Sequence, residues 1–142
     1  MNPIQANQIA ELLNRCNELK SSFTSDQLLR YAHEYKFIQD EDTNDVVAVV
    51  QIKKVQWYQH EIGNLTVSPE HQGKELAQRL LQTAERQALN EGAHILQGTV
   101  RQNDQENIEL FKSAGFKHVS NFYNQHSDRN ITVWQKILSP VK

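Results

Sequence analysis

Hydrophobic residues near the start of the chain recur at the spacing of an α-helix. The stripe that they form contains Ile9, Leu12, Leu13, Cys16 and Leu19. Asn2 and Pro3 precede it, and these residue types suit the N-cap and the first position of a helix. The pattern therefore predicts a first helix that starts at Pro3, with Cys16 as a small hydrophobic residue of its buried face.

A second helix is indicated shortly afterwards. Thr24 followed by Gln27 has the spacing of a capping box, in which each side chain satisfies a backbone N–H of the first helical turn. The expected buried face of this helix is Leu28, Leu29, Ala32 and Tyr35. We therefore expect two helices before residue 36.

From residue 36 the pattern changes to short runs rich in β-branched residues. It predicts strands over residues 36–39, 46–58 and 62–67, with a polar turn at 40–45 and a second turn at Gln59–His60. The apolar run from Val46 to Val50 is typical of a strand that is buried on both faces. Three consecutive antiparallel strands are expected here.

The second half of the chain alternates helices and strands. A clean helical face is formed by Leu76, Ala77, Leu80, Leu81, Ala84 and Ala88, and Gly92 suits the end of that helix. The following strand, 95–100, is expected to run parallel to strand 62–67 through a right-handed crossover. A helix over 104–113 and strands over 116–123 and 131–138 complete the prediction. The last strand is expected at an edge of the sheet, where it could pair with a second copy in a homodimer.

These elements predict an α+β fold: a mixed, mainly antiparallel central sheet flanked by helices, with one β-α-β crossover. At 142 residues, the chain is expected to form a single domain over 1–142. A net charge of −2 gives no broad basic surface, so a nucleic-acid partner is not expected.

Composition also bears on location. No run approaches the length of a membrane span, and the first residues do not resemble a signal peptide. One cysteine, Cys16, permits no internal disulfide and fits a reducing compartment. We therefore expect a cytoplasmic protein without a membrane partner. The six histidines show no metal-ligand spacing, and His60 and His71 are expected at the surface.

The segment from Ile62 to Ala77 carries the first candidate chemistry. A strand stops before Pro69, a polar turn follows with Gly73 and Lys74, and a helix begins near Glu75. The unpaired N–H groups and the positive dipole end of a helix N-terminus bind anions, and a glycine lets the anion approach the backbone. This arrangement is typical of a phosphate-binding turn, although a glycine beside a lysine also occurs in ordinary surface turns.

The residue types in this segment resemble a known family. The pattern Val67-x-Pro69-x-x-Gln72-Gly73-x-x-Leu76-Ala77 is similar to the acetyl-CoA signature of the GNAT superfamily of N-acyltransferases. The resemblance implies that backbone around Leu65, Thr66 and Val67 pairs with the pantetheine arm. It also implies that the pyrophosphate is cradled by Gln72, Gly73, Lys74, Glu75, Leu76 and Ala77. The family usually has a second glycine where this chain has Glu75.

A second motif supports the same resemblance. The pattern Asn103-Asp104-x-x-Asn107-x-x-Leu110-Phe111-x-x-x-Gly115-Phe116 is similar to the GNAT segment that precedes a Gly-Phe pair. By this resemblance, Asn103, Asn107 and Phe111 belong to the cofactor-binding residues. Phe111 stands where the family usually has a tyrosine that acts as general acid.

Glu61 and Tyr123 are the candidate catalytic residues. Family members that deprotonate an amine often carry a glutamate at the position of Glu61, although a glutamate at a strand end is also commonly a solvent-exposed residue. Strand alternation would place Glu61, Gly63, Leu65 and Val67 on one face. By resemblance, the Val67 N–H would polarise the thioester oxygen. Tyr123 is the candidate general acid, because phenylalanine at 111 has no proton to donate.

The resemblance implies an N-acyltransferase that moves an acetyl group from acetyl-CoA to a primary amine by direct attack. The alternative is a non-catalytic acyl-CoA-binding or regulatory module with the same fold, and Glu75 and Phe111 favour it. A third reading is an interaction protein that keeps only the fold. The acceptor stays open among polyamines, amino acids, antibiotics, peptides and protein lysines. The acidic run at 40–45 is either a solvated loop or an attraction for a cationic acceptor.

Overall fold

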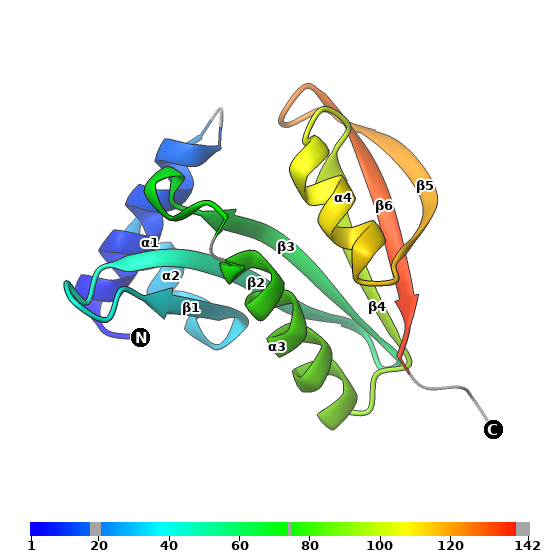
Figure 1. The fold of residues 1–142 in the computed structure, drawn as a ribbon, viewed down its shortest axis with the longest axis horizontal. Coiled ribbons are helices and arrows are strands. Elements are labelled where there is room, and N and C mark those ends of the chain that lie inside the picture. The colour runs from blue at the N-terminus through cyan, green and yellow to red at the C-terminus, as the bar shows by residue number, and fades with distance from the viewer. Residues whose placement is uncertain (18–20, 74, 139–142) are drawn as a thin grey trace. The chain divides into compact units, whose positions relative to one another are not determined.

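The computed structural model describes residues 1–17, 21–73 and 75–138. Its strands form a six-stranded sheet in the order β1-β2-β3-β4-β6-β5 (Figure 1). Along the chain, α1 and α2 precede the first strand, α3 connects β3 to β4, and α4 connects β4 to β5. The fold is the mixed, mainly antiparallel α+β arrangement expected from the sequence. Leu19 and Lys74 lie outside the described residues.

The chain divides into two compact units. The N-terminal unit comprises residues 1–51 and 64–81, and the C-terminal unit comprises residues 52–63 and 82–142. The boundaries fall within β2, β3 and α3, so these three elements contribute residues to both units. The single domain expected over residues 1–142 stays a prediction.

Two capped helices form the outer layer of the N-terminal unit. Helix α1 (Pro3–Cys16) has a capping box between Asn2 and Gln5, and α2 (Ser25–Arg30) has one between Thr24 and Gln27. Both N-caps are confirmed. The buried core beneath the helices contains Ala6, Ile9, Ala10, Leu12, Leu13, Leu28, Tyr35, Val46 and Val49, and Cys16 packs against it. Ala32 lies in a short 3₁₀ helix (Ala32–Glu34) and Tyr35 already belongs to the next strand, so the α-helix is shorter than expected.

Strands β1 (Tyr35–Gln39) and β2 (Val46–Gln56) pair antiparallel, and the run from Val46 to Val50 is buried as predicted. The polar turn between them is closed by Asp40, whose side chain accepts hydrogen bonds from the backbone N–H groups of Asp42 (2.8 Å) and Thr43 (3.1 Å). These hydrogen bonds join residues only two or three positions apart, so the polar sequence of residues 40–45 was enough to predict the turn.

Strand β3 (Gln59–Val67) begins earlier than the sequence pattern indicates. The turn that precedes it falls at Trp57–Tyr58, so the predicted turn at Gln59–His60 is wrong. Within the strand, Asn64 has a left-handed φ of 54°. Burial nevertheless alternates through Asn64: His60, Ile62 and Thr66 are buried. The half-buried positions include Glu61, Gly63, Leu65 and Val67, a pattern that agrees with the shared face expected for these four residues. The side chain of Asn64 donates to the Gln51 side chain of β2 at 2.8 Å.

Helix α3 (Leu76–Asn90) leads into β4 (Ile95–Arg101), which pairs parallel to β3 with Glu61 opposite Gln97. This pairing confirms the predicted β-α-β crossover. Five of the six residues of the predicted helical face are buried in α3, namely Leu76, Leu80, Leu81, Ala84 and Ala88. The sixth, Ala77, is half-buried.

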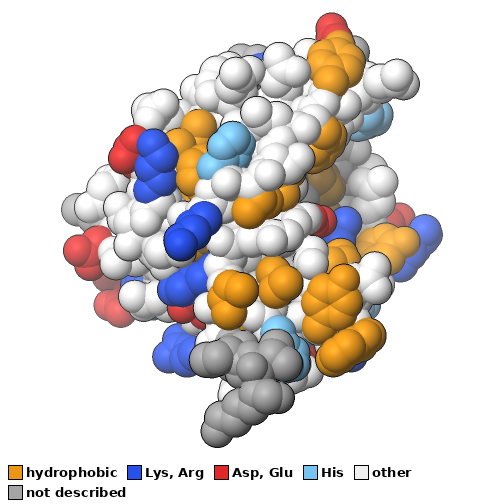
Figure 2. Space-filling view, turned by 90° about the vertical axis from the view of Figure 1, so that its right-hand side faces the viewer, with side chains coloured by type: hydrophobic (Ala, Val, Ile, Leu, Met, Phe, Trp, Pro, Cys, Tyr) orange, Lys and Arg blue, Asp and Glu red, His pale blue; other side chains and the backbone are white. Residues whose placement is uncertain are grey.

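In the C-terminal unit, α4 (Gln105–Ser113) is followed by β5 (Lys117–Asn124) and β6 (Arg129–Ile137). The last strand was expected at an edge, and that prediction is wrong: β6 lies between β4 and β5, and β5 is the edge strand. Figure 2 faces the side on which β5 lies in Figure 1, and hydrophobic side chains are exposed on it. The exposed large hydrophobic residues of β5 are Val119, Phe122 and Tyr123. Among the described residues, no helix is both long and apolar enough to cross a membrane.

Candidate active site

The turn that follows β3 is the segment in which the sequence predicts phosphate binding, and we call it the phosphate-binding turn after that prediction. A short 3₁₀ helix, Pro69–His71, comes directly after Ser68, and the Gln72 side chain returns to donate to the Val67 carbonyl oxygen at 3.0 Å. Gly73 has a φ of 78°, and no heavy atom lies within 4 Å of the position that a Cβ would take. Glycine is therefore needed for its conformation, and the space beside its backbone is open to an anion.

Glu75 lies between this turn and α3. Its φ of 62° is in the left-handed region, where a residue with a Cβ is strained by about 1 kcal/mol. Its carbonyl oxygen accepts the first helical hydrogen bond, from the Arg79 N–H at 3.0 Å, so Glu75 caps the helix. The backbone conformation explains why a glycine is usual at this position in the GNAT pattern, and the exposed carboxylate adds a negative charge where an anion is expected.

The other residues predicted to bind the cofactor in this segment differ in accessibility. Leu65, Val67 and Ala77 are half-buried, whereas Thr66 and Leu76 are buried. The Thr66 hydroxyl donates to the Asn64 carbonyl oxygen (3.1 Å) and accepts from the Asn17 side chain (3.3 Å). Because the Thr66 side chain is buried and its hydroxyl is already hydrogen-bonded, only its backbone could contact a cofactor.

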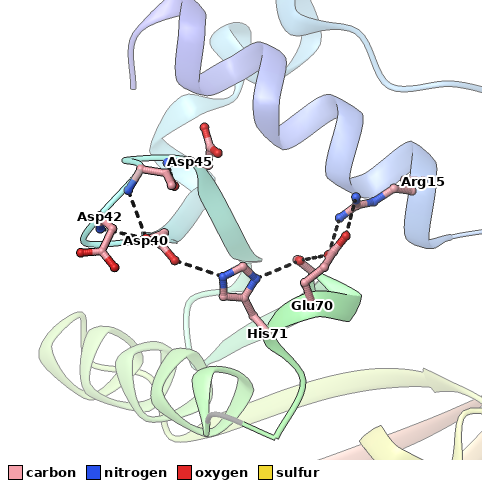
Figure 3. Close-up of polar contacts among 8 residues, drawn as sticks. Arg15, Asp40, Asp42, Asp45, Glu70 and His71 are labelled. Atoms are coloured by element: carbon pink, nitrogen blue, oxygen red, sulfur yellow. Dashed lines mark hydrogen bonds and ion pairs between the residues drawn. The ribbon is translucent and has the colours of Figure 1, made fainter.

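A chain of polar contacts braces the same turn (Figure 3). His71 Nε2 lies 3.1 Å from Asp40 Oδ2, and His71 Nδ1 lies 3.1 Å from the Ser68 hydroxyl. That hydroxyl donates to Glu70 at 2.5 Å, and Glu70 pairs with Arg15 of α1 at 3.3 Å. With both carboxylates ionised, all these contacts are satisfied together when both ring nitrogens of His71 carry a proton. We call these five residues the bracing network.

The bracing network perturbs its two carboxylates. The backbone N–H groups of Asp42 and Thr43, together with His71, hold the pKa of Asp40 below its ordinary value. The Ser68 hydroxyl and the Glu70 backbone N–H, with Arg15 and His71 adding charge, lower the pKa of Glu70 in the same way. His71 was expected at the surface, and instead it joins the β1–β2 turn to the phosphate-binding turn. The sequence gives no signal for this contact, because Asp40 is 31 positions away.

A hollow of about 400 Å³ lies beside the bracing network in the N-terminal unit. Its charged lining residues are Glu11, Arg15, Asp45, Glu70 and His71. Asp45 comes from the acidic run, and Gln8 of α1 holds it by a hydrogen bond of 3.1 Å. Acidic groups therefore predominate in the lining, which is the charge that suits a cationic molecule.

Glu61 lies in the C-terminal unit, on the half of β3 that pairs with β4. It is half-buried, and its Oε1 accepts a hydrogen bond of 2.6 Å from the Gln97 side chain. A short bond to an ionised carboxylate of this kind is a strong one. The carboxylate is thus partly shielded from water and held by a partner that the sequence did not identify.

His60, the neighbour of Glu61, is also not a surface residue. Its side chain is 1% exposed and bonds Glu91 at 3.0 Å, a contact that lowers the pKa of Glu91. Because β3 starts at Gln59, alternation places His60 on the same buried face as Ile62. The correct start of the strand would have revealed this from the sequence.

The residues predicted on and before α4 form the next part of the C-terminal unit. Asp104 caps the helix, and the Asn107 side chain donates to its carboxylate at 2.9 Å. Asn103 is exposed and lines a hollow of about 280 Å³ that also contains Arg129. Both asparagines thus lie where the chain passes from β4 into α4.

Phe111 does not fit its predicted role at the cofactor. Its side chain is 1% exposed, stacks on Phe116 with ring centroids 4.9 Å apart, and lies against Gly98 of β4. A ring enclosed in the core cannot contact a cofactor at the surface. This corrects the sequence prediction for the Phe111 side chain.

Tyr123 is far from Glu61 along the sheet. Glu61 is opposite Gln97 and Gln97 is opposite Gln135, whereas Tyr123 is opposite Asn130, five residues away from Gln135 on β6. The offset is about 17 Å along the strands and about 14 Å across them. Tyr123 is 54% exposed on β5 and its side chain does not meet Glu61, so its role as general acid stays a prediction without support from this geometry.

Within the part of the chain that the structure describes, no group of three or more His, Cys, Asp or Glu side chains is arranged to hold a metal ion.

Comparison with known proteins identifies the fold and the family. In fold, the chain is similar to yncA from Salmonella typhimurium, solved with its cofactor acetyl-CoA (18% identity, TM-score 0.82, covering 100% of this chain and 93% of that one). It is also similar to Ard1 from Thermoplasma volcanium (17% identity, TM-score 0.82, covering 99% of this chain and 95% of that one). A third similar structure is the ribosomal-protein-S18-alanine N-acetyltransferase from Escherichia coli (15% identity, TM-score 0.76, covering 100% of this chain and 93% of that one).

At the level of sequence, no curated protein matches the chain. The model of the acetyltransferase (GNAT) family matches residues 6–116, which include β3, the phosphate-binding turn, α3 and α4. The chain therefore belongs to the acetyltransferase (GNAT) family.

Proposed function

We propose that this acetyltransferase moves an acetyl group from acetyl-CoA to a primary amine by direct attack, with Glu61 as the general base. The observation that carries the proposal is the succession of left-handed residues Gly73 and Glu75 at the N-terminus of α3. The first backbone N–H groups of a helix have no partner within the helix, and they suit the diphosphate of the coenzyme. Glu61 lies on the strand that leads into that turn.

The residues present fit acetyl-CoA, which supplies an acetyl group activated as a thioester. The turn from Gln72 to Ala77 would hold the diphosphate, and the open space beside Gly73 supports this. The backbone of Leu65, Thr66 and Val67 would bind the pantetheine arm, and Asn103 and Asn107 are further candidates from the C-terminal unit. yncA, which shares this fold, holds acetyl-CoA as its cofactor.

Glu61 would take a proton from the acceptor ammonium, directly or through water, so that the neutral amine attacks the thioester. The Val67 N–H would stabilise negative charge on the thioester oxygen. The half-buried position of Glu61 and its bond to Gln97 support the first role, because they restrict the carboxylate to one orientation. No general acid is assigned: Phe111 lacks a donor and Tyr123 is distant. A thiolate is a stable leaving group, so the reaction does not depend on one.

The acceptor is proposed only as a primary amine of a small molecule or peptide. The acidic lining of the 400 Å³ hollow supports a cationic acceptor. We also propose a cytoplasmic location, on the basis of the lone Cys16. A homodimer stays a proposal, and the sheet edge that it would use is β5.

Calorimetry with acetyl-CoA, followed by thiol release with a panel of amines, tests the proposal. Gly73→Asp should abolish the heat of coenzyme binding, because it forces a side chain and a negative charge into the turn. Glu61→Gln should bind acetyl-CoA normally but lower the rate, most of all at low pH, where few acceptor amines are already neutral. Glu109→Gln on the exposed face of α4 is the matched control and should change neither.

Two results would overturn the proposal. If acetyl-CoA gives no heat of binding, the protein does not use this coenzyme. If Glu61→Gln has an unchanged rate, Glu61 is not the general base.

A further inference from the structure

Three polar residues are aligned across neighbouring strands of the C-terminal unit. Glu61 on β3 is directly opposite Gln97 on β4, and Gln97 is directly opposite Gln135 on β6. All three side chains are half-buried. Residues that are opposite one another on adjacent strands have side chains on the same face, so the register alone brings the carboxylate and the two amides into one row.

The hydrogen bonds along this row have a fixed direction. An ionised carboxylate only accepts, so the Gln97 atom that faces Glu61 must be Nε2, and the bond to Glu61 Oε1 is 2.6 Å long. Gln97 Oε1 then points the other way, and Gln135 Nε2 donates to it at 2.8 Å. The contacts with Glu61 and with Gln135 thus favour the same orientation of the Gln97 amide.

We infer that Gln97 is a positioning residue for the general base and that Gln135 acts through it by fixing the orientation of its amide. The inference rests on the proposed function of Glu61. Because Gln97 occupies Oε1, the carboxylate has one defined rotamer and presents Oε2 to the acceptor amine. Without the donor, the carboxylate would sample other rotamers, and a displacement of a reacting group by about 1 Å can cost up to about a hundredfold in rate.

A packing role for the two glutamines makes different predictions. If they only filled space, methionine, which has a similar shape, would replace either of them without loss. If the amide direction matters, the near-isosteric change Gln135→Glu should be harmful. A carboxylate at that position would attract Gln97 Nε2 and turn Gln97 Oε1 towards Glu61, which removes the donor and adds repulsion.

The experiment measures kcat and KM for acetyl-CoA in these variants, with folding checked by urea unfolding. Gln97→Met and Gln135→Glu should each lower kcat about tenfold and leave KM for acetyl-CoA within about twofold. Gln135→Met should lower kcat less than these two changes, because it removes the hydrogen bond to Gln97 Oε1 without turning the Gln97 amide around. Gln82→Met, on an exposed position of α3, is the matched control and should have no effect.

Epistasis and spectroscopy separate this inference from the proposed function. In the Glu61→Gln background, Gln97→Met should cause no further loss, since there is no base left to position. The side-chain amide NMR signals of Gln97 should shift in Glu61→Gln and in Gln135→Glu, whether or not the enzyme is turning over. Unshifted Gln97 signals, or a full tenfold loss from Gln97→Met in the absence of Glu61, would overturn the inference. Full activity in Glu61→Gln would contradict the proposed role of Glu61 as general base. Loss of activity in Glu61→Gln together with full activity in Gln97→Met would contradict only the inference about Gln97.

Discussion

Phe111 lies directly against Gly98, the residue of β4 that follows Gln97. A Cβ at position 98 would be 2.7 Å from Phe111 Cζ and closer still to Cε2. The absence of a side chain at Gly98 is thus what allows α4 to rest on β4, and Phe111 stacks on Phe116 at the same place.

Gly98→Ala should therefore destabilise the protein by about 1–3 kcal/mol, because the Phe111 ring has to move away from the added methyl group. The free energy of urea unfolding measures this. Gly63→Ala is the matched control: no heavy atom lies within 4 Å of its Cβ position, so its stability should change by less than about 0.5 kcal/mol. Equal losses in both variants would contradict the close contact.

Phe111→Tyr should not restore a general acid. The new hydroxyl would extend from the ring atom that faces the Gly98 backbone, in a site that is 1% exposed. Burying a hydroxyl without a partner costs about 1–3 kcal/mol, so we expect lower stability in urea and no gain in the rate of thiol release. A rate increase of several-fold would show that position 111 reaches the thioester.

Glu75→Gly should tighten acetyl-CoA binding by calorimetry and raise stability. Glycine relieves the strain of the left-handed backbone, and the change removes a negative charge next to the phosphate-binding turn. Glu75→Gln removes the charge and keeps the strain, so it isolates the electrostatic part. Unchanged affinity in both variants would mean that the carboxylate lies away from the bound diphosphate.

The bracing network should make stability depend on pH in the acidic range. The pKa of Asp40 is lowered by the backbone N–H groups of Asp42 and Thr43 and by His71. A group whose pKa is lower when folded contributes stability above its unfolded pKa, and this contribution is lost as the pH falls through the folded value. Between pH 6 and pH 2, the urea midpoint of Asp40→Asn should therefore fall less than that of the wild type. Parallel curves for the two proteins would contradict this role for Asp40.

The elements that could be predicted from the sequence are those that local contacts determine. Both capping boxes join residues three positions apart, Asn2 with Gln5 and Thr24 with Gln27, so the pattern itself contains the interaction. The strand–turn–helix around Gly73 is local in the same way. Strand order is not local, and the edge position was assigned to the last strand instead of β5 for that reason.

The candidate site shows the same division. Glu61 is identified by its place in a motif, but its partner Gln97 is 36 positions away, and Gln135 is another 38 positions from Gln97. Only the register of three strands brings them together, and hydrophobic periodicity does not encode register between strands that are distant in sequence. The same argument applies to Asp40 and His71.

The left-handed residue at Asn64 has a consequence for how this enzyme can vary. A φ of 54° is a backbone conformation that asparagine and glycine adopt at low cost and that β-branched residues avoid. Few residue types can therefore replace Asn64 while β3 keeps its path, so this position is expected to tolerate far less variation than the other positions of the strand.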